Sequence, residues 1–412
     1  MASEPTRPGI LLPYPGAALM IVRSIELFHV AVPLKAKIRH ASHERTESDS
    51  LIVRATLDSG EVGYGEGVPR SYVTGETIET AFNALAGYDA ARAVGKPSDF
   101  GDAVHRIAAI ELPEIASDPR GMFGNAARCA LELALLDAFG RAFGHSVGDA
   151  ARRLCEAGLG YHDRPWPVRY SGAITAASTR KERISAFKMR LYGFHQVKIK
   201  VGVDGQDDPS RLAKLRKILG AKMDIRIDAN EAWAAGDLVA RVRPLLPFRP
   251  TALEQPVPHA EVSALAELRA DLGVSVMLDE SLCGYPDALR SVAESTADIF
   301  NVRLSKCGGL APSLRIMALA GRSGLTVQLG CHPGETGLLS AAGRHVASNV
   351  AGIRYVEGSY DRHILAANLI NEEITFGYGG RAKPLAGPGL GVTVNPRALE
   401  AMTVARREVS FV

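Results

Sequence analysis

The sequence predicts an α/β protein in which a TIM-type barrel follows a smaller α+β domain. Three observations lead to this fold. Strand-like and helical stretches are mixed up to about Gly160, eight strand-like runs alternate with helical stretches after Pro167, and acidic residues or lysines follow or end five of these runs. Repeated βα units form parallel sheets, and eight such units close into a barrel.

The size and composition of the chain are those of a globular protein. Its 412 residues are enough for one large domain and one smaller domain. Hydrophobic residues make up 46% and charged residues 23% of the chain, which is ordinary for a folded protein. The net charge of +3 is small for this length, so neither nucleic acid nor an anionic membrane surface is expected as a partner.

The first 19 residues and the cysteines bear on the location of the protein. Residues 1–19 are apolar in part, but Pro13 and Pro15 interrupt them and Glu4 lies near the start. A flexible leader is therefore expected, with a secretory signal as the alternative. The chain has five cysteines and no Cys-x-x-Cys pair, so neither disulfides nor a zinc site are expected, and a cytoplasmic location fits. No apolar run reaches the roughly 18 residues that a membrane helix needs.

Residues 20–160 are expected to form the smaller domain. An alternating stretch begins at Met20, and two apolar runs flank the turn residues 58–60, a pattern typical of a β-hairpin. Farther on, Leu131, Leu135 and Phe139 recur at helical spacing, which predicts an amphipathic helix.

Residues 161–385 are expected to form the barrel. Its eight strand-like runs are PVRYSGAI, HQVKIKV, MDIRIDAN, TALEQPV, VSVMLDES, DIFNVRLSKCGG, LTVQLGCH and GIRYVEG. Helical stretches such as SRLAKLRKIL and PSLRIMALAGRS separate them, as expected for βα units. Residues 386–412 begin with a Gly/Pro-rich stretch and are expected to return to the first domain.

Side chains that could carry chemistry lie toward the ends of the second to sixth strand-like runs. They are Lys198, Lys200, Asp228, Asn230, Glu254, Asp279, Glu280 and Lys306. The spacing from one run to the next is about 26 residues, the length of one βα unit, so these residues are expected at one height around one mouth of the barrel. Active sites of TIM barrels lie at this C-terminal face.

The three carboxylates of Asp228, Glu254 and Asp279 suggest a metal site. Without a partner they would repel one another and raise each other's pKa. A hard divalent cation removes this conflict, and oxygen ligands favour Mg²⁺, or Mn²⁺ as a substitute, over zinc. The alternative is that these carboxylates pair with lysines or cap helices.

The lysines suggest proton transfer at carbon. Lys200 and Lys306 lie four strands apart, on opposite sides of the predicted mouth. A carbon acid next to a carboxylate is very weak, so its deprotonation needs a cation to stabilise the charge and a lysine with a lowered pKa. The neighbouring cation Lys198 would lower the pKa of Lys200. The alternative is that all three lysines are solvated surface charges.

This set of motifs resembles the enolase superfamily, and within it the muconate cycloisomerase subgroup of the mandelate racemase/muconate lactonizing enzyme family. The matching segments are KIK at 198–200, DAN at 228–230, EQP at 254–256, DES at 279–281 and SKCGG at 305–309. The resemblance covers about residues 20–400. It implies a modified (β/α)7β barrel closed by an α+β capping domain, and enolase-type sites that combine a lysine or histidine base with Mg²⁺.

The resemblance also implies individual roles. Asp228, Glu254 and Asp279 would bind the metal, and Lys200 and Lys306 would be the acid/base pair. Lys198 would assist Lys200 and contact the substrate carboxylate. Asn230 and Glu280 would be partners of these residues, with Glu280 orienting Lys306.

Substrate specificity is expected to reside in the loops around the mouth. The segments 33–46 and 68–77 are the candidate covering loops, and the second contains Arg70, a possible carboxylate ligand, and Tyr72. Glu335 resembles a late family glutamate near the substrate. The candidates after the eighth strand are Asp361 and Arg362.

Two adjacent residues and one family motif remain open. Cys331 could be a nucleophile beside His332, although sequence neighbours rarely form a catalytic pair, and a structural role for His332 is the alternative. Dipeptide epimerases of the family typically carry Asp-x-Asp after the eighth strand. Here the sequence is Ser359-Tyr360-Asp361, which places dipeptide epimerisation in doubt.

The expected function is a Mg²⁺-dependent enzyme that abstracts the proton α to a carboxylate and forms a metal-stabilised enediolate. The favoured reactions are those of an isomerase: racemisation or epimerisation of an N-acyl amino acid or related acid, or cycloisomerisation. The alternative is a lyase, either a syn-dehydratase of the o-succinylbenzoate synthase type or an acid-sugar dehydratase. A non-catalytic protein that binds a small molecule is a further alternative. The expected partner is a small-molecule carboxylate, and the chain is expected to form a homo-oligomer.

Overall fold

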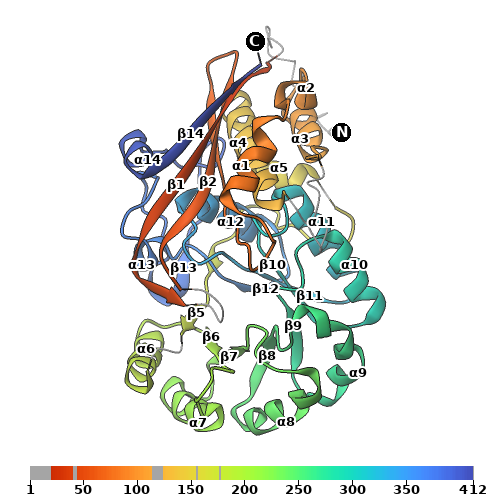
Figure 1. Cartoon of the computed structure of the whole chain (residues 1–412), viewed down its shortest axis with the longest axis vertical. Helices are drawn as coiled ribbons and strands as arrows, with labels where there is room; N and C mark the ends of the chain where they lie inside the picture. The colour runs from red at the N-terminus through yellow and green to blue at the C-terminus, as the bar shows by residue number, and fades with distance from the viewer. Residues whose placement is uncertain (1–19, 40–43, 114–123, 155, 176–177, 412) are drawn as a thin grey trace, which may run out of the picture.

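The computed structural model describes residues 20–39, 44–113, 124–154, 156–175 and 178–411. The leader expected at residues 1–19 lies outside the described residues, as do positions 40–43 of the first covering loop. The molecule has a barrel in its lower half and a sheet with helices above it (Figure 1). Within the described part of the chain, no helix combines the length and apolarity needed to cross a membrane.

The upper part is built on a four-stranded antiparallel sheet in the order β14-β1-β2-β3. Its strands are β1 (Val22–Arg39), β2 (Glu44–Leu57), β3 (Val62–Gly67) and β14 (Thr403–Ser410). The predicted hairpin is confirmed, because β2 and β3 pair from Thr56–Val62 to Leu51–Gly67. Five helices accompany the sheet: α1 (Ile78–Ala86), α2 (Ala90–Val94), α3 (Phe100–Ala108), α4 (Asn125–Phe143) and α5 (Val147–Leu154).

Helix α4 lies directly on this sheet. A side chain at Gly63, Gly65 or Gly67 of β3 would clash with the backbone of α4, so these glycines permit the close approach. The helix predicted around Leu131 is confirmed, but its amphipathic character is not. Every residue from 129 to 140 is buried, because the sheet covers one side of α4 and the barrel covers another.

The lower part is a parallel eight-stranded sheet in the order β5 to β12, and all eight predicted runs contribute to it. A hydrogen bond of 2.8 Å from the Ser171 N–H to the Val356 carbonyl joins the first and last strands. The strands are β5 (Gly172–Ile174), β6 (Gln196–Lys200), β7 (Asp224–Asp228), β8 (Pro250–Glu254), β9 (Ser275–Leu278), β10 (Ile299–Val302), β11 (Thr326–Leu329) and β12 (Ile353–Val356).

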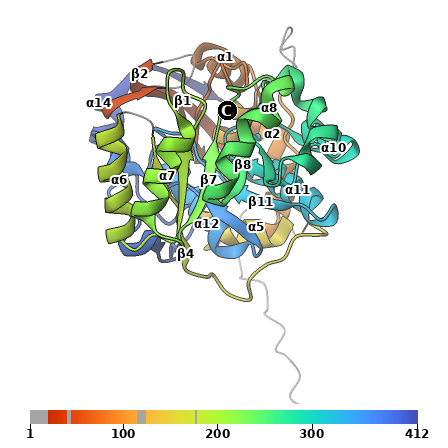
Figure 2. The same ribbon diagram turned by 90° about the horizontal axis from the view of Figure 1, so that it is seen from below.

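Helices surround the barrel, as the view from below shows (Figure 2). They are α6 (Thr179–Leu191), α7 (Asp208–Leu219), α8 (Leu238–Val242), α9 (Leu265–Leu268), α10 (Tyr285–Glu294), α11 (Leu310–Arg322) and α12 (Gly337–Asn349). Short 3-10 segments cover 235–237, 243–248, 259–264, 269–271 and 378–380. Beyond β12 the chain forms α13 (Asp361–Ile364), α14 (Pro396–Met402) and β13 (Arg381–Ala382), which pairs with β4 (Val168–Arg169).

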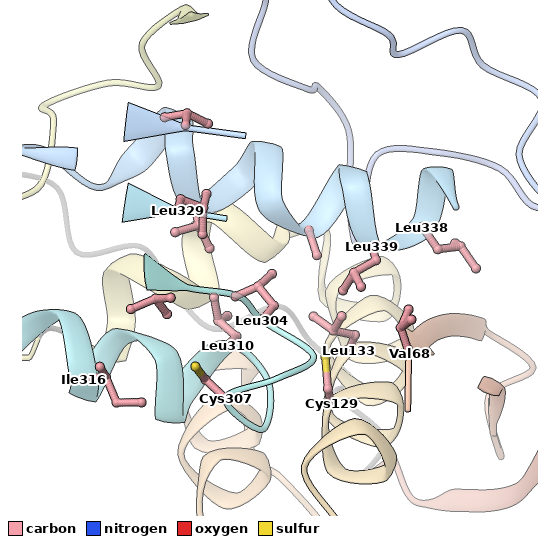
Figure 3. Close-up of a cluster of buried hydrophobic side chains, with 14 of the residues drawn as sticks. Val68, Cys129, Leu133, Leu304, Cys307, Leu310, Ile316, Leu329, Leu338 and Leu339 are labelled. Carbon is pink, nitrogen blue, oxygen red and sulfur yellow. The ribbon is translucent and has the colours of Figure 1, made fainter. Parts of the chain in front are cut away.

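The upper and lower parts share one hydrophobic core. Val68, Cys129 and Leu133 of the upper part face Leu310 and Leu338, which lie in the first turns of the helices after β10 and β11 (Figure 3). A separate apolar cluster fills the barrel interior, and its members are Ala252, Met277, Ile299 and Tyr355. The last strand, β14, returns to pair with β1, from Ser24–Ser410 onward.

Candidate active site

Strand register brings the predicted site residues to one level. Lys200 pairs with Asp228 across β6 and β7, and Asp228 pairs with Glu254 across β7 and β8. Side chains of a strand alternate between its faces, so Lys198 and Lys200 point to the same side. That side is the barrel interior, above the apolar cluster around Tyr355.

Lys198 lies at the centre of a carboxylate cluster. Its Nζ is 3.3 Å from Asp228 Oδ2, 3.4 Å from Glu254 Oε1 and 3.2 Å from Glu357 Oε2. Burial alone would lower the pKa of Lys198, but these three carboxylates outweigh burial and raise the pKa well above its usual value. In this arrangement Lys198 therefore favours its protonated form rather than acting as a base.

Glu357 is a site residue that the sequence analysis missed. It directly follows β12, and its second oxygen accepts a hydrogen bond of 2.9 Å from Arg226, a fully buried residue of β7. Arg226 also donates to Gln328 and stacks on Tyr355, with 4.4 Å from its guanidinium carbon to the ring centroid. The sequence analysis looked for charged residues at strand ends and so identified Asp228 and Glu254. The same search at the eighth strand would have identified Glu357.

Glu254 is fully buried. Its Oε1 accepts a hydrogen bond of 2.9 Å from Asn301 Nδ2 and lies near Lys198. Its Oε2 is buried and has no hydrogen-bond partner among the described residues. A buried carboxylate oxygen without a partner is costly unless a ligand satisfies it.

Lys306 is buried on the opposite side of the barrel from Lys200. Its Nζ donates to the carbonyl of Asp279 at 2.7 Å, to Asp279 Oδ1 at 2.8 Å and to the carbonyl of Asn301 at 2.9 Å. Burial lowers its pKa to about 8, and the nearby Arg303 contributes to this shift. A lysine with this pKa can exchange a proton near neutral pH.

Lys200 is half-buried, and its pKa is also lowered. Burial is the main cause, the carboxylates of Asp228 and Glu280 oppose it, and the charge of Lys198 adds to it. Lys198 therefore lowers the pKa of Lys200, as predicted, but burial lowers this pKa more.

The loops after the strands hold these side chains in place. Gln255 has a φ of 35°, which is uncommon for a residue other than glycine. Its Oε1 accepts hydrogen bonds from the N–H groups of Asp279 at 3.0 Å and Ser281 at 3.1 Å. Asn230, with a φ of 43°, donates from Nδ2 to Glu280 Oε1 at 3.1 Å. Local backbone strain of this kind is maintained by the surrounding contacts.

The carboxylates pair with cations in this structure. Within the described ranges, no three His, Cys, Asp or Glu side chains gather closely enough to hold a metal ion. Lys198 lies beside Asp228 and Glu254, while Lys306 and Arg303 bind Asp279. The donor set is nevertheless all oxygen, which suits a hard divalent cation, and Glu254 Oε2 still lacks a partner.

Glu335 and Asp361 are both buried near the mouth. Glu335 lines two adjacent cavities, one of which Asp361 also lines. Its Oε2 accepts the N–H of His332 at 3.0 Å, and Asp361 accepts hydrogen bonds from Ser340 at 2.8 Å and Asn368 at 3.0 Å. Burial raises the pKa of both carboxyl groups.

The remaining substrate-binding candidates are Arg362, Arg70 and Tyr72. Arg362 is exposed, and its carbonyl accepts a hydrogen bond from Lys35. Arg70 is only 6% exposed, so it is not an ordinary surface arginine. It donates to the carbonyls of Asp49 and Pro69 and to the hydroxyl of Ser48. Tyr72 packs against the small apolar cluster of Val73 and Cys283.

Cys331 is not an activated nucleophile. It is buried, and burial raises the pKa of its thiol well above the ordinary value, so the thiolate that attack requires is not formed at neutral pH. The described cysteines, at 129, 283, 307 and 331, are free and buried.

Comparison with known proteins identifies the family and the fold. The description of the matching family is Enolase C-terminal domain-like, and the match covers residues 182–398. The chain belongs to this family. The sequence-based resemblance to the enolase superfamily is confirmed, as is the α/β barrel fold.

Three relatives match this chain over most of its length. Hydrophobic dipeptide epimerase from Enterococcus faecalis is 27% identical over 91% of this chain and 100% of its own. N-succinyl-L-Arg/Lys racemase from Bacillus cereus is 26% identical over 93% and 98%, respectively. Muconate cycloisomerase 1 from Rhodococcus opacus is 29% identical over 92% and 98%.

A solved structure agrees with these relatives. Dipeptide epimerase from Cytophaga hutchinsonii, in complex with Mg and the dipeptide D-Ala-L-Val, superposes with a TM-score of 0.79 at 25% identity, covering 95% of this chain and 100% of the other. All four of these proteins are isomerases by name, and none is named as a lyase. The chain is an enzyme of the enolase superfamily.

Proposed function

We propose that this enzyme is a Mg²⁺-dependent isomerase that removes the proton α to a substrate carboxylate and returns a proton to the opposite face. The observation that carries this proposal is the pair of lysines on β6 and after β10. They stand on opposite sides of the carboxylate cluster, and burial lowers the pKa of both. Two bases on opposite faces are what inversion of one carbon requires.

The proposed metal ligands are Asp228, Glu254 and Asp279. To bind the ion, they would exchange their contacts with Lys198, Lys306 and Arg303 for it. Bound Mg²⁺, or Mn²⁺ in its place, would stabilise the negative charge that develops on the substrate carboxylate. Lys198 keeps its proton and would bind one oxygen of that carboxylate.

In the proposed reaction one lysine gains a proton and the other loses one. One lysine, neutral at the start, takes the α-proton and becomes an ammonium group. The other begins as an ammonium group and gives its proton to the opposite face of the carbon. The reverse reaction exchanges these roles, so the same pair serves both enantiomers of the substrate.

The proposed substrate is an N-acyl amino acid or a related acid. A dipeptide carries a free ammonium group, and the residue where an Asp-x-Asp motif would begin is Ser359. Its hydroxyl already contacts Arg344 at 2.8 Å and the Tyr170 hydroxyl at 3.3 Å. A cation here would also lie close to the buried guanidinium of Arg344, which disfavours it.

Proton exchange followed by NMR in D₂O tests this proposal. With Mg²⁺ present, the α-proton signal of N-acyl amino acids should disappear with wild-type enzyme and persist in EDTA. The double variant Lys200→Met/Lys306→Met should show no exchange, whereas Lys214→Met, at an exposed lysine of α7, should behave as wild type. Unchanged exchange in the double variant would show that the lysines are not the bases.

We further propose a homo-oligomeric, cytoplasmic enzyme. Ile184, Phe187 and Leu191 form one exposed apolar face of α6, with Tyr192 beside it, as is common where a second copy packs. The free thiols of the described cysteines suit a reducing compartment. Light scattering of the purified protein tests the assembly, and a monomer at micromolar concentration would contradict it.

A further inference from the structure

The two proposed bases are held in different ways. The ammonium group of Lys306 donates three hydrogen bonds, two to the carbonyl and Oδ1 of Asp279 and one to the carbonyl of Asn301. Within the described part of the chain, Lys200 Nζ makes no hydrogen bond or ion pair. The position of Lys200 therefore depends on the backbone at the end of β6.

A buried arginine holds this backbone from outside the barrel. Arg211 lies on α7, the helix that follows β6, and its NH2 donates to the carbonyl of Lys200 at 3.0 Å. Lys200 is the last residue of β6, so this hydrogen bond ties the end of the strand to the helix.

Two carboxylates orient the guanidinium group of Arg211. Glu182, a buried residue of α6, accepts hydrogen bonds from Nε at 3.2 Å and from NH2. Asp208, in the first turn of α7, accepts a hydrogen bond from NH1. All three nitrogens of the guanidinium are thus bound, and a planar fork of donors held in this way has a fixed orientation.

The same network holds the loop that follows Lys200. Asp208 Oδ2 accepts the N–H of Gly202 at 2.7 Å, and the Val201 N–H donates to the carbonyl of Asp228 at 2.8 Å. Gly202 has a φ of +73°, and a side chain there would meet Ala232 Cβ at 2.7 Å. The loop is therefore fixed by α7 on one side and by the end of β7 and the loop after it on the other.

Stability alone is a weak reason for a buried ion network of this kind. A buried ion pair often stabilises a protein no more than apolar side chains of similar volume, because both charges lose their hydration. Directional hydrogen bonds, by contrast, fix a geometry. Here Glu182 and Asp208 orient the guanidinium, and its remaining acceptor is the carbonyl of a proposed base.

We infer that Arg211 is a positioning residue for Lys200. This inference rests on the proposed function: with Glu182 and Asp208, Arg211 fixes the end of β6 and so sets where the Lys200 amine meets the α-proton. Lys306 has its own acceptors on the other side of the barrel. Misplacement of a reacting group by about 1 Å can slow a reaction by about 10²-fold, so loss of this anchor should affect one face of the substrate and spare the other.

Proton exchange of the separate enantiomers in D₂O tests this assignment on the Mg²⁺-loaded full-length enzyme. The substrate is the N-acyl amino acid that the wild type exchanges fastest, and Lys306→Met identifies the enantiomer that Lys200 serves. In Arg211→Met, exchange of this enantiomer should fall by about tenfold or more, while the other stays within about twofold of wild type. Arg211→Lys should recover part of the rate, because it keeps the charge and loses the fork of donors.

A second variant removes the network without leaving Glu182 unpaired. Arg211→Met leaves this buried carboxylate without its cation, which is strongly destabilising. Glu182→Leu/Arg211→Leu replaces the ion pair with apolar side chains and should fold, as thermal unfolding would show. The hydrogen bond to the Lys200 carbonyl is lost in this variant, so it should show the same loss of exchange for one enantiomer.

The matched control is Arg216→Met, on the same helix. Arg216 donates to the carbonyls of Phe248 at 2.9 Å and Met223 at 2.6 Å, which precede β8 and β7 at the other end of the barrel. Its loss should lower stability and leave the ratio of the two exchange rates unchanged. An equal loss for both enantiomers in the Arg211 variants, or no loss for either, would overturn the positioning role.

Crystal structures separate this inference from the proposed function. In Glu182→Leu/Arg211→Leu, Lys200 should move by about 1 Å relative to the wild type, while Lys306 stays in place. An unmoved Lys200 would overturn the inference. Absence of exchange on every N-acyl amino acid by the wild type would contradict the isomerase, and the position of Lys200 in the two crystal structures would still decide the role of Arg211.

Discussion

The carboxylate of Glu66 binds the backbone of Thr336, which lies 270 residues farther along the chain. Its two oxygens accept the Thr336 N–H at 2.9 and 3.1 Å, and Oε2 also accepts the Thr336 hydroxyl at 2.7 Å and the Leu339 N–H at 3.1 Å. A residue of the upper sheet thus caps the N-terminus of α12 and fixes the end of the turn that contains His332. Glu132 of α4 caps α11 in the same way, through the N–H groups of Leu310 and Ala311.

Replacement of Glu66 should weaken the contact between the two parts of the molecule. In Glu66→Gln, one oxygen becomes an amide NH₂ that faces N–H donors. Leaving such buried groups unsatisfied costs about 1–3 kcal/mol. The free energy of unfolding in urea should fall by this amount, and the KM should rise. Glu79→Gln, at an exposed position of α1, should change neither, and an equal loss in both variants would contradict the capping role.

Single lysine variants should separate the two faces of the substrate. In Lys306→Met, the α-proton of one enantiomer should still exchange with solvent through Lys200, with retention of configuration, while racemisation falls by at least 10²-fold. Lys200→Met should show the complementary enantiomer preference. Chiral chromatography combined with NMR in D₂O measures both quantities. Wild-type exchange of both enantiomers in either variant would mean that one base serves both faces.

Mg²⁺ should stabilise the folded protein through the three proposed ligands. A ligand at 100 times its Kd stabilises the native state by about 2.7 kcal/mol, so saturating Mg²⁺ should raise the melting temperature by several degrees. Glu254→Gln and Asp279→Asn should each remove most of this increase. Glu267→Gln, at an exposed glutamate of α9, should retain it. A full Mg²⁺ effect in both ligand variants would place the metal elsewhere.

His345 should make stability depend on pH. It is buried in α12, its Nε2 contacts the carbonyl of Leu390 at 3.0 Å, and burial lowers its pKa to about 4. The unfolded chain takes up a proton near pH 6.5 whereas the folded protein does not, so stability is lost as the pH falls below 6.5. Between pH 7.5 and 5.5 the loss from this residue is about 1 kcal/mol.

The variant His345→Gln isolates this contribution. Urea unfolding of both proteins at pH 7.5, 6.5 and 5.5 gives the difference in stability at each pH. This difference should shift by about 1 kcal/mol in favour of the variant as the pH falls. Parallel pH curves for the two proteins would contradict a buried, neutral His345.

Local sequence patterns identified the barrel and the proposed catalytic residues. The eight strand-like runs became the eight strands β5 to β12, and residues that end consecutive runs, such as Asp228 and Glu254, lie side by side. This worked because parallel strands in a closed barrel share one direction and a fixed register, so position within a run determines height in the barrel.

The sequence pattern was misleading for α4 and incomplete for Arg226 and Glu357. The spacing of Leu131 and Leu135 predicted one apolar face, yet α4 is covered on nearly every side by a sheet and a barrel that are formed elsewhere in the chain. Arg226 and Glu357 were missed because their ion pair joins strands 131 positions apart, and no local pattern encodes such a partnership.

The sequence by itself therefore determined which side chains reach the mouth of the barrel. Only the tertiary structure decided their electrostatic state: Lys198 held by three carboxylates, Lys306 with a pKa of about 8, and His332 among cations. The physical reason is that strand periodicity is a property of neighbouring residues, whereas desolvation and charge pairing depend on groups that meet only when the upper sheet closes over the barrel.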